Sequence, residues 1–227
     1  MFEQTVENIV QTSLINKSEN LMKIYDVENF PNPLRVRIAL AEKNATDKAT
    51  FIPVDLMNGE HRTAEFLAKN PAGGVPVLEL EDGTFIAECS AIIEYIDHEF
   101  SGPSLTGNTA KDRAVISMMQ RRAESMVLDA VATYFHHATD GLGPALETYQ
   151  NKAWGQKQLE KALSGLAYFD TVLAKSSYLA GDEFTVADIT LHTGLVFAGF
   201  AQITVPSELT NLIAWQARIA NRPSIAA

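Results

Sequence analysis

The sequence has one cysteine, no long apolar run and few basic residues. A single Cys among 227 residues excludes an internal disulfide framework, a CxxC redox pair and a thiolate metal site. No apolar run approaches the ~18 residues needed to cross a bilayer, and the N-terminus lacks a basic stretch followed by an apolar one. With 18 Lys and Arg against 28 Asp and Glu, the formal net charge is −10, which argues against a nucleic-acid surface. These absences favour a cytoplasmic protein that binds no metal, nucleic acid or membrane.

What is present predicts two domains. Residues 1–21 form an N-terminal extension to which we assign no function, because the first strand pattern begins only at residue 22. From there the periodicity predicts the order β-α-β-α-β-β-α. A linker rich in Gly, Pro and Ser follows at 101–108, and every later segment has a helical pattern. We therefore expect an α/β domain at 22–102 and an all-helical domain at 103–227.

Local signals fix several element ends. Asn32 is the expected N-cap of the first helix, with Pro33 at its first helical position. The turn at 81–83 carries Asp-Gly, a strong hairpin signal between two strands. Thr185 and Asp188 form a capping box, which predicts a helix start within the second domain.

Three motifs resemble those of the cytosolic glutathione transferases, in the same order and spacing. "NPAGGVPVLEL" resembles the segment around the family's cis-proline, "ECSAIIEYID" the opening of its third helix, and "YLAGDEFTVADI" its capping-box segment. "RVRIALAEKN", "GEH", "AEFLAKN" and "YFHHAT" are most similar to an atypical fungal subgroup typified by a yeast enzyme. The resemblance, from residue 22 to the C-terminus, implies a thioredoxin-like first domain, a homodimer and glutathione as substrate.

The resemblance also implies which residues of the first domain bind glutathione. Pro76 would form a cis peptide bond, which X-Pro tolerates at ~0.5–1 kcal/mol, and so expose the backbone of Val75 to the ligand. Glu88 would accept a hydrogen bond from the ligand's ammonium group. The helix start at Cys89 and Ser90 favours the γ-glutamyl carboxylate. The family normally has Ser in place of Cys89, and a thiol is a weaker donor, so an inert buried cysteine is the preferred reading for catalysis.

Two further regions have less specific signals. His61 would contact the glycyl end of glutathione by analogy with theta-like members, and a solvated loop histidine is the alternative. A helix at 109–139 has one apolar face, which should pack in the bundle. The part around 118–126 is read as dimer or substrate surface, and Tyr134 or Phe30 is expected near the cleft.

The residue that activates glutathione is missing from its usual place. "NFPNPLRVRIALAEK" has no Ser, Thr, Tyr or Cys at the junction where the family places it. Lowering a thiol pKa from about 8.5 to ~6.5 requires about 2.7 kcal/mol, and the helix start supplies only ~0.3–2. A neutral histidine, acting directly or through one water, would supply the rest. The fungal subgroup is thought to hold such a water with a His and a Ser, which match His136 and Ala132. We therefore predict His136 as the base, with His137 as the substitute.

The sequence thus predicts a detoxifying transferase that adds the glutathione thiolate to small electrophiles. Glutathione-dependent disulfide or peroxide reduction is an alternative, because it also needs no protein cysteine. An inactive dimerisation or binding module is the other alternative. His61, Val75, Pro76 and Glu88 favour real glutathione binding, whereas the missing activating residue and Cys89 favour the module.

Overall fold

The computed structural model describes residues 22–226, and the predicted extension at 1–21 lies outside this range. The first domain contains the predicted β-α-β-α-β-β-α series, with two short 3₁₀ turns, η1 and η2. Its elements are β1 (Met22–Asp26), α2 (Pro31–Glu42), η1 (Thr46–Lys48), β2 (Ala49–Pro53), η2 (Glu60–Arg62), α3 (Ala64–Lys69), β3 (Val77–Leu80), β4 (Phe85–Ala87) and α4 (Cys89–Glu99). The expected α/β class of this domain is confirmed.

The four strands form one mixed sheet in the order β2-β1-β3-β4. β1 pairs in parallel with β2 and antiparallel with β3, and β3 pairs antiparallel with β4. The predicted hairpin joins β3 to β4, where Gly83 has φ +84°, a value that glycine adopts without strain. Ile92, Ile93 and Ile96 of α4 are fully buried.

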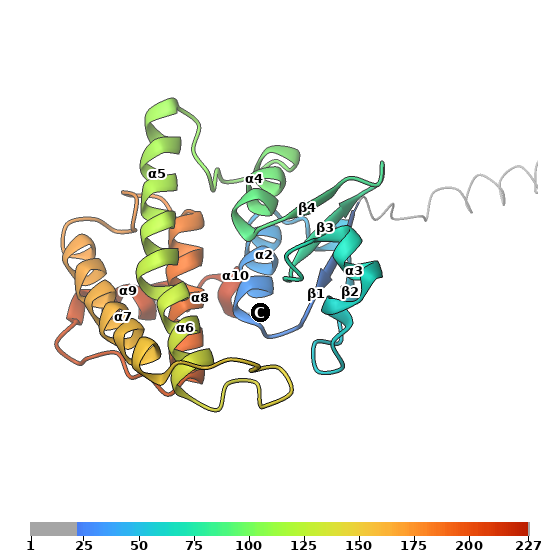
Figure 1. The fold of residues 1–227 in the computed structure, drawn as a ribbon. Helices are drawn as coiled ribbons and strands as arrows, with labels where there is room; N and C mark the ends of the chain where they lie inside the picture. Colours follow the sequence, from blue (N-terminus) through green and yellow to red (C-terminus); the bar gives the residue numbers. More distant parts are fainter. Residues whose placement is uncertain (1–21, 227) are drawn as a thin grey trace, which may run out of the picture.

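The regular elements of the second domain are all helices over its described length, as predicted. It consists of α5 (Ala110–Ala123), η3 (Glu124–Leu128), α6 (Asp129–Ala138), α7 (Lys152–Leu173), α8 (Val186–Phe200), α9 (Thr210–Ile219) and α10 (Pro223–Ala226). The domain boundary predicted at 102/103 falls between α4 and α5 and stays a prediction. In Figure 1 the sheet with α2, α3 and α4 lies on one side of the molecule and α5 to α9 on the other. The last helix returns to the first domain, and Arg222, directly before it, pairs with Glu42 of α2 at 2.7 Å.

The first helix starts earlier than the sequence predicts. α2 begins at Pro31 with Phe30 as N-cap, and no side chain caps it. The prediction of Asn32 as N-cap and Pro33 as first helical residue is therefore wrong. Pro31 suits the first helical position as well as Pro33 does, since both rings fix φ near the helical value.

The predicted long helix at 109–139 is interrupted. η3 is a single turn of π-helix between α5 and α6, and such a turn inserts extra chain into a helix. The predicted apolar face still packs into the bundle, with Val127, Leu128, Val131 and Phe135 buried. The second-domain capping box is confirmed, since Thr185 and Asp188 bond reciprocally at the start of α8. Burial raises the pKa of Asp188 to about 6, against the opposing effect of its hydrogen-bond donors.

Candidate functional site

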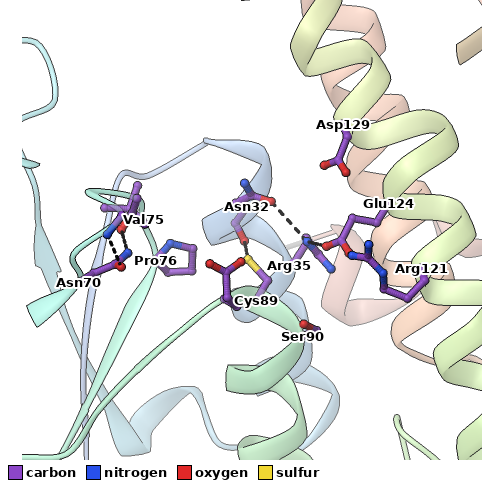
Figure 2. A pocket seen from close by; sticks show the side chains of 13 residues that line it. Asn32, Arg35, Asn70, Val75, Pro76, Cys89, Ser90, Arg121, Glu124 and Asp129 are labelled. Carbon is purple, nitrogen blue, oxygen red and sulfur yellow. Dashed lines mark hydrogen bonds and ion pairs between the residues drawn. The ribbon is translucent and has the colours of Figure 1, made fainter. Parts of the chain in front are cut away.

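A polar cavity of about 400 Å³ lies where the two domains meet. Figure 2 shows its walls: the loop before β3, the start of α2, the start of α4, and the α5–α6 region opposite. Its lining is Asn32, Arg35, Asn70, Ala72, Gly74, Val75, Pro76, Glu88, Cys89, Ser90, Arg121, Glu124 and Asp129. The predicted residues Val75, Pro76, Glu88, Cys89 and Ser90 thus share one cavity.

The loop before β3 presents free backbone to this cavity. The Val75-Pro76 peptide bond is cis, as predicted. Asn70 holds the loop by donating to the Gly74 carbonyl at 2.9 Å and accepting from the Ala72 N–H at 3.1 Å. The N–H and C=O of Val75 have no main-chain partner within residues 22–226. They are therefore available to a peptide ligand lying along the loop.

The start of α4 forms a second wall. Glu88 precedes it with φ +70°, a left-handed conformation that is uncommon for a non-glycine residue. The N–H groups of Cys89 and Ser90 have no main-chain partner in the described chain, and free N–H groups at a helix start favour an anion. Figure 2 shows Ser90 at this end of α4.

Cys89 is a structural thiol in this structure. Its side chain is 6% exposed, and its Sγ donates to the Asn32 carbonyl at 3.3 Å. Burial raises the pKa of the Cys89 thiol to about 11. A group with this pKa is a poor source of thiolate near neutral pH, and its hydrogen links the starts of α2 and α4.

A buried arginine joins the domains beneath the cavity. Arg35 of α2 is 2% exposed and contacts Glu124 of η3 at 2.9 Å and Thr190 of α8 at 3.1 Å. Glu124 also pairs with the exposed Arg121 at 2.5 Å. The sequence alone favours a solvated or surface ion-paired Arg35, because nothing local marks its partners 89 and 155 residues away.

The start of α2 offers one backbone donor. Pro31 and Pro33 have no N–H, and the Leu34 N–H bonds to the Phe30 carbonyl at 3.0 Å. The Asn32 N–H is thus the one free main-chain donor in this first turn, as far as the described chain shows. Its position at the positive end of the helix favours a thiolate over a thiol.

A second, apolar cavity of about 400 Å³ adjoins the first. The two cavities share Asn32, Val75 and Asp129. The second cavity is otherwise lined by Glu28, Asn29, Phe30, Pro31, Pro33, Leu128, Ala132, Phe135, His136, Leu142, Val196, Phe197 and Phe200. A ligand group at the junction would reach a polar pocket on one side and aromatic walls on the other.

Asp129 is a carboxylate at this junction. It is the first residue of α6, directly after the π-helical turn. Desolvation between the walls and, next, the Glu124 charge raise the pKa of Asp129. The sequence places Asp129 on the polar face of the long helix, but only the fold brings that face to the start of α2.

The three predicted histidines lie in different places in the structure. His136 lines the second cavity, whereas His61 and His137 line neither cavity. His137 instead accepts the Asn151 N–H on Nδ1 at 3.0 Å, at the start of α7. His61 lies in η2 with Nδ1 buried and unpartnered among residues 22–226, and burial and the charge of Arg62 lower its pKa.

The described residues show no group of three or more His, Cys, Asp or Glu side chains suited to a metal ion. Residues 22–226 also contain no helix that is long and apolar enough to cross a membrane.

Comparisons with known proteins agree with this geometry. A family model for "Glutathione S-transferase, N-terminal domain" matches residues 31–99, and one for "Glutathione S-transferase, C-terminal domain" matches 123–223. Glutathione S-transferase 2 of Saccharomyces cerevisiae is 54% identical over 209 residues, 92% of this chain and 90% of the yeast protein.

Solved structures give the same result. The crystal structure of Gtt2 from Saccharomyces cerevisiae has 55% identity and a TM-score of 0.88, covering 90% of this chain and 98% of that one. A glutathione S-transferase domain-containing protein of Marinobacter aquaeolei has 64% identity and a TM-score of 0.89, covering 89% and 99%. The chain belongs to the glutathione S-transferase family and is a glutathione transferase with a thioredoxin-like first domain.

Proposed function

We propose that the protein conjugates the thiolate of glutathione to small apolar electrophiles, with glutathione in the polar cavity and the electrophile in the aromatic one. The observation that supports this most is the junction of the two cavities at Asn32, Val75 and Asp129. A tripeptide paired with the Val75 backbone would have its sulfur near the Asn32 N–H. An electrophile against Phe30 and Phe135 would lie within reach of that sulfur.

Ligand recognition in the polar cavity follows from the groups that line it. Glu88 accepts from the glutathione ammonium, and Ser90 with the N–H groups at the start of α4 binds the γ-glutamyl carboxylate. His61 remains the proposed contact of the glycyl end, although it lines neither cavity. Cys89 contributes its backbone N–H and not its thiol, because that thiol already donates to the Asn32 carbonyl.

His136 is the proposed base that removes the thiol proton, directly or through one water. It lines the aromatic cavity, and general-base assistance typically contributes ~10²–10⁴-fold. Ala132 cannot anchor a water, since it has no polar side-chain atom. The Asn32 N–H and the helix end supply the remaining stabilisation of the thiolate.

The test compares His136→Ala with the parent protein. Calorimetry of glutathione binding should be unchanged, whereas thiolate absorbance of bound glutathione should appear only at higher pH. Conjugation to 1-chloro-2,4-dinitrobenzene should fall on the order of a hundredfold at neutral pH. Parallel data on His137→Ala decide between the two neighbours, and a thiolate titration unchanged in His136→Ala refutes the assignment.

The same assays decide between conjugation and reduction. A protein that turns over a glutathione mixed disulfide or an organic peroxide, but no aryl or alkyl electrophile, is a reductase instead. Absence of any turnover together with intact glutathione binding would leave only a binding module.

We also propose a homodimer in the cytoplasm. Met118 of α5 is an exposed apolar side chain, 43% accessible, at the edge of the surface predicted to dimerise. The free Cys89 suits a reducing compartment. Light scattering after gel filtration tests the dimer, and imaging of a fluorescent fusion tests the location.

A further inference from the structure

The segment between α6 and α7 places a carboxylate against His136. Glu147 Oε1 lies 2.7 Å from His136 Nδ1, and the same oxygen accepts the Leu142 N–H at 2.8 Å. The Glu147 side chain is 9% exposed, whereas that of His136 is 40% exposed. A side chain at Gly141 would overlap the Glu147 carboxylate, so the glycine lets the segment turn closely over it. The carboxylate is thus buried and fixed, and the imidazole stays accessible.

The contact determines which nitrogen of His136 carries hydrogen. Burial alone would raise the pKa of Glu147, but its hydrogen bonds to Leu142 and His136 prevail and lower it. Glu147 is therefore a carboxylate at neutral pH and can only accept. His136 Nδ1 must then donate, which leaves Nε2 of the neutral ring as an acceptor. Within residues 22–226 nothing occupies Nε2.

The other charged groups near His136 do not compete for this arrangement. Glu28 and Asp129 are the remaining ionisable side chains of the aromatic cavity, and both are acids. Asp129 and Ala132 precede His136 by seven and four residues, close to one helical face. His137 is engaged by the Asn151 N–H. Among the cavity-lining side chains His136 is the one imidazole.

We propose that Glu147 is a positioning residue, which fixes His136 with Nε2 as the acceptor for the thiol proton of glutathione. This rests on the proposed function, in which His136 is the base. When the thiol ionises, its S–H bond breaks, an N–H bond forms at Nε2, and the electron pair stays on sulfur. The Glu147 charge then offsets the imidazolium charge. The electron pair on sulfur then forms a carbon–sulfur bond with the electrophile, the bond to the leaving group breaks and its electron pair departs with that group, and the proton passes from Nε2 to solvent.

The segment that carries Glu147 has anchors of its own. Gln150 donates to the carbonyls of His136 and Thr139 at 2.7 and 2.8 Å. Arg62 of η2 donates to the Leu146 carbonyl at 3.3 Å, which ties the segment to the first domain. These contacts do not involve the charge of Glu147, so that charge can be removed while the segment stays attached.

The test is Glu147→Gln, with Gln150→Ala as the matched control. A glutamine retains the side-chain length and an oxygen that accepts from Leu142, but has no charge. We expect kcat/KM for conjugation to fall about 10–100-fold, by analogy with the loss of the partner that orients a metal-bound histidine. The KM for glutathione should change little, and the thiolate absorbance of bound glutathione should move to higher pH. Gln150→Ala, which loosens the segment without touching the imidazole, should leave the thiolate titration unchanged.

A double-mutant cycle completes the test. In a His136→Ala background, Glu147→Gln should have no further effect, because positioning a missing base does nothing. The proposal is refuted if Glu147→Gln titrates like the parent protein, if its effect adds to that of His136→Ala, or if Gln150→Ala reproduces it. If His136→Ala loses the thiolate but Glu147→Gln titrates like the parent protein, only the positioning role of Glu147 is refuted. Unaltered thiolate in His136→Ala refutes the base assignment as well. Because the thiolate absorbance is measured with glutathione as the only ligand, the role of Glu147 can be tested even if no electrophile is turned over.

Discussion

Replacing Arg35 by methionine should reveal how strongly the domains depend on one buried charge. Arg35 is 2% exposed and its guanidinium links α2 to η3 and α8 through Glu124 and Thr190. Methionine keeps an unbranched apolar stem of similar reach. Arg35→Met therefore removes the charge and its hydrogen bonds while leaving much of the packing.

The magnitude follows from what each partner loses. Breaking a buried ion pair by removing one side costs ~3–5 kcal/mol, because the other charge stays buried and unpaired. Glu124 is partly accessible and keeps Arg121 at 2.5 Å, which reduces this cost. The Thr190 hydroxyl still donates to the Val186 carbonyl at 2.8 Å. We therefore expect unfolding to become easier by about 2–3 kcal/mol, close to a 1 M decrease in urea midpoint at a typical slope of ~2–3 kcal/mol/M.

Urea unfolding followed by circular dichroism and by tryptophan fluorescence measures this change, since Trp215 is fully buried. Arg121→Met is the control, because Arg121 pairs with the same carboxylate but is exposed, and such pairs are worth ~0.2–1 kcal/mol. The Arg35→Met, Glu124→Met double variant should be more stable than Arg35→Met alone. An Arg35→Met loss no larger than that of Arg121→Met, or strictly additive losses in the double variant, would refute the reasoning.

Three further predictions concern other residues. Cys89 should not react with Ellman's reagent in the folded protein and should react once urea unfolds it, because a pKa of about 11 leaves only about one thiol in ten thousand ionised at pH 7. Fast labelling of the native protein would contradict this. Asp97→Asn should cost ~3 kcal/mol at neutral pH, because it leaves Lys43 in a buried pair without its charge partner. Hydrogen bonds from Thr106 and others outweigh burial and lower the pKa of Asp97, so its contribution is complete above about pH 4 and is lost on further acidification. Stability of the variant, measured by urea titration at several pH values, should therefore fall less steeply below pH 4, and an equally steep fall would count against the argument. Phe200→Ala, at the aromatic cavity, should raise the KM for aromatic electrophiles about 2–10-fold, the value of one aromatic contact. The KM for glutathione is the internal control, and equal changes in both KM values would disprove a specific contact.

Features set by neighbouring residues were predictable from the sequence. The Thr185 and Asp188 capping box and the hairpin at Gly83 depend on a few adjacent side chains, whereas the cis bond before Pro76 was expected from the resemblance to the family. The start of α2 was misplaced by two residues because Pro31 and Pro33 fit the first helical position equally well. Local chemistry did not distinguish them.

Features set by distant contacts were not predictable in the same way. Arg35 and Glu124 are 89 residues apart, and no pattern near either indicates that they meet under a cavity. Glu147 lies in an irregular segment without periodicity, so its contact with His136 could not be read from spacing. The resemblance of a six-residue motif led us to predict His136 as the base, whereas nothing in the sequence indicated that Glu147 lies 2.7 Å from it.

The π-helical turn Glu124–Leu128 rotates the side chains of α6 about the helix axis relative to those of α5. Each residue of an α-helix turns the chain by ~100°, so an extra residue changes the azimuth of everything after it. α5 upstream and α6 downstream can therefore aim their faces independently, one at the neighbouring α8 and the other at the aromatic cavity. Deleting a single residue from this turn would leave composition and length almost unchanged, yet rotate Asp129 away from the junction and His136 away from the aromatic cavity by roughly a quarter of a revolution.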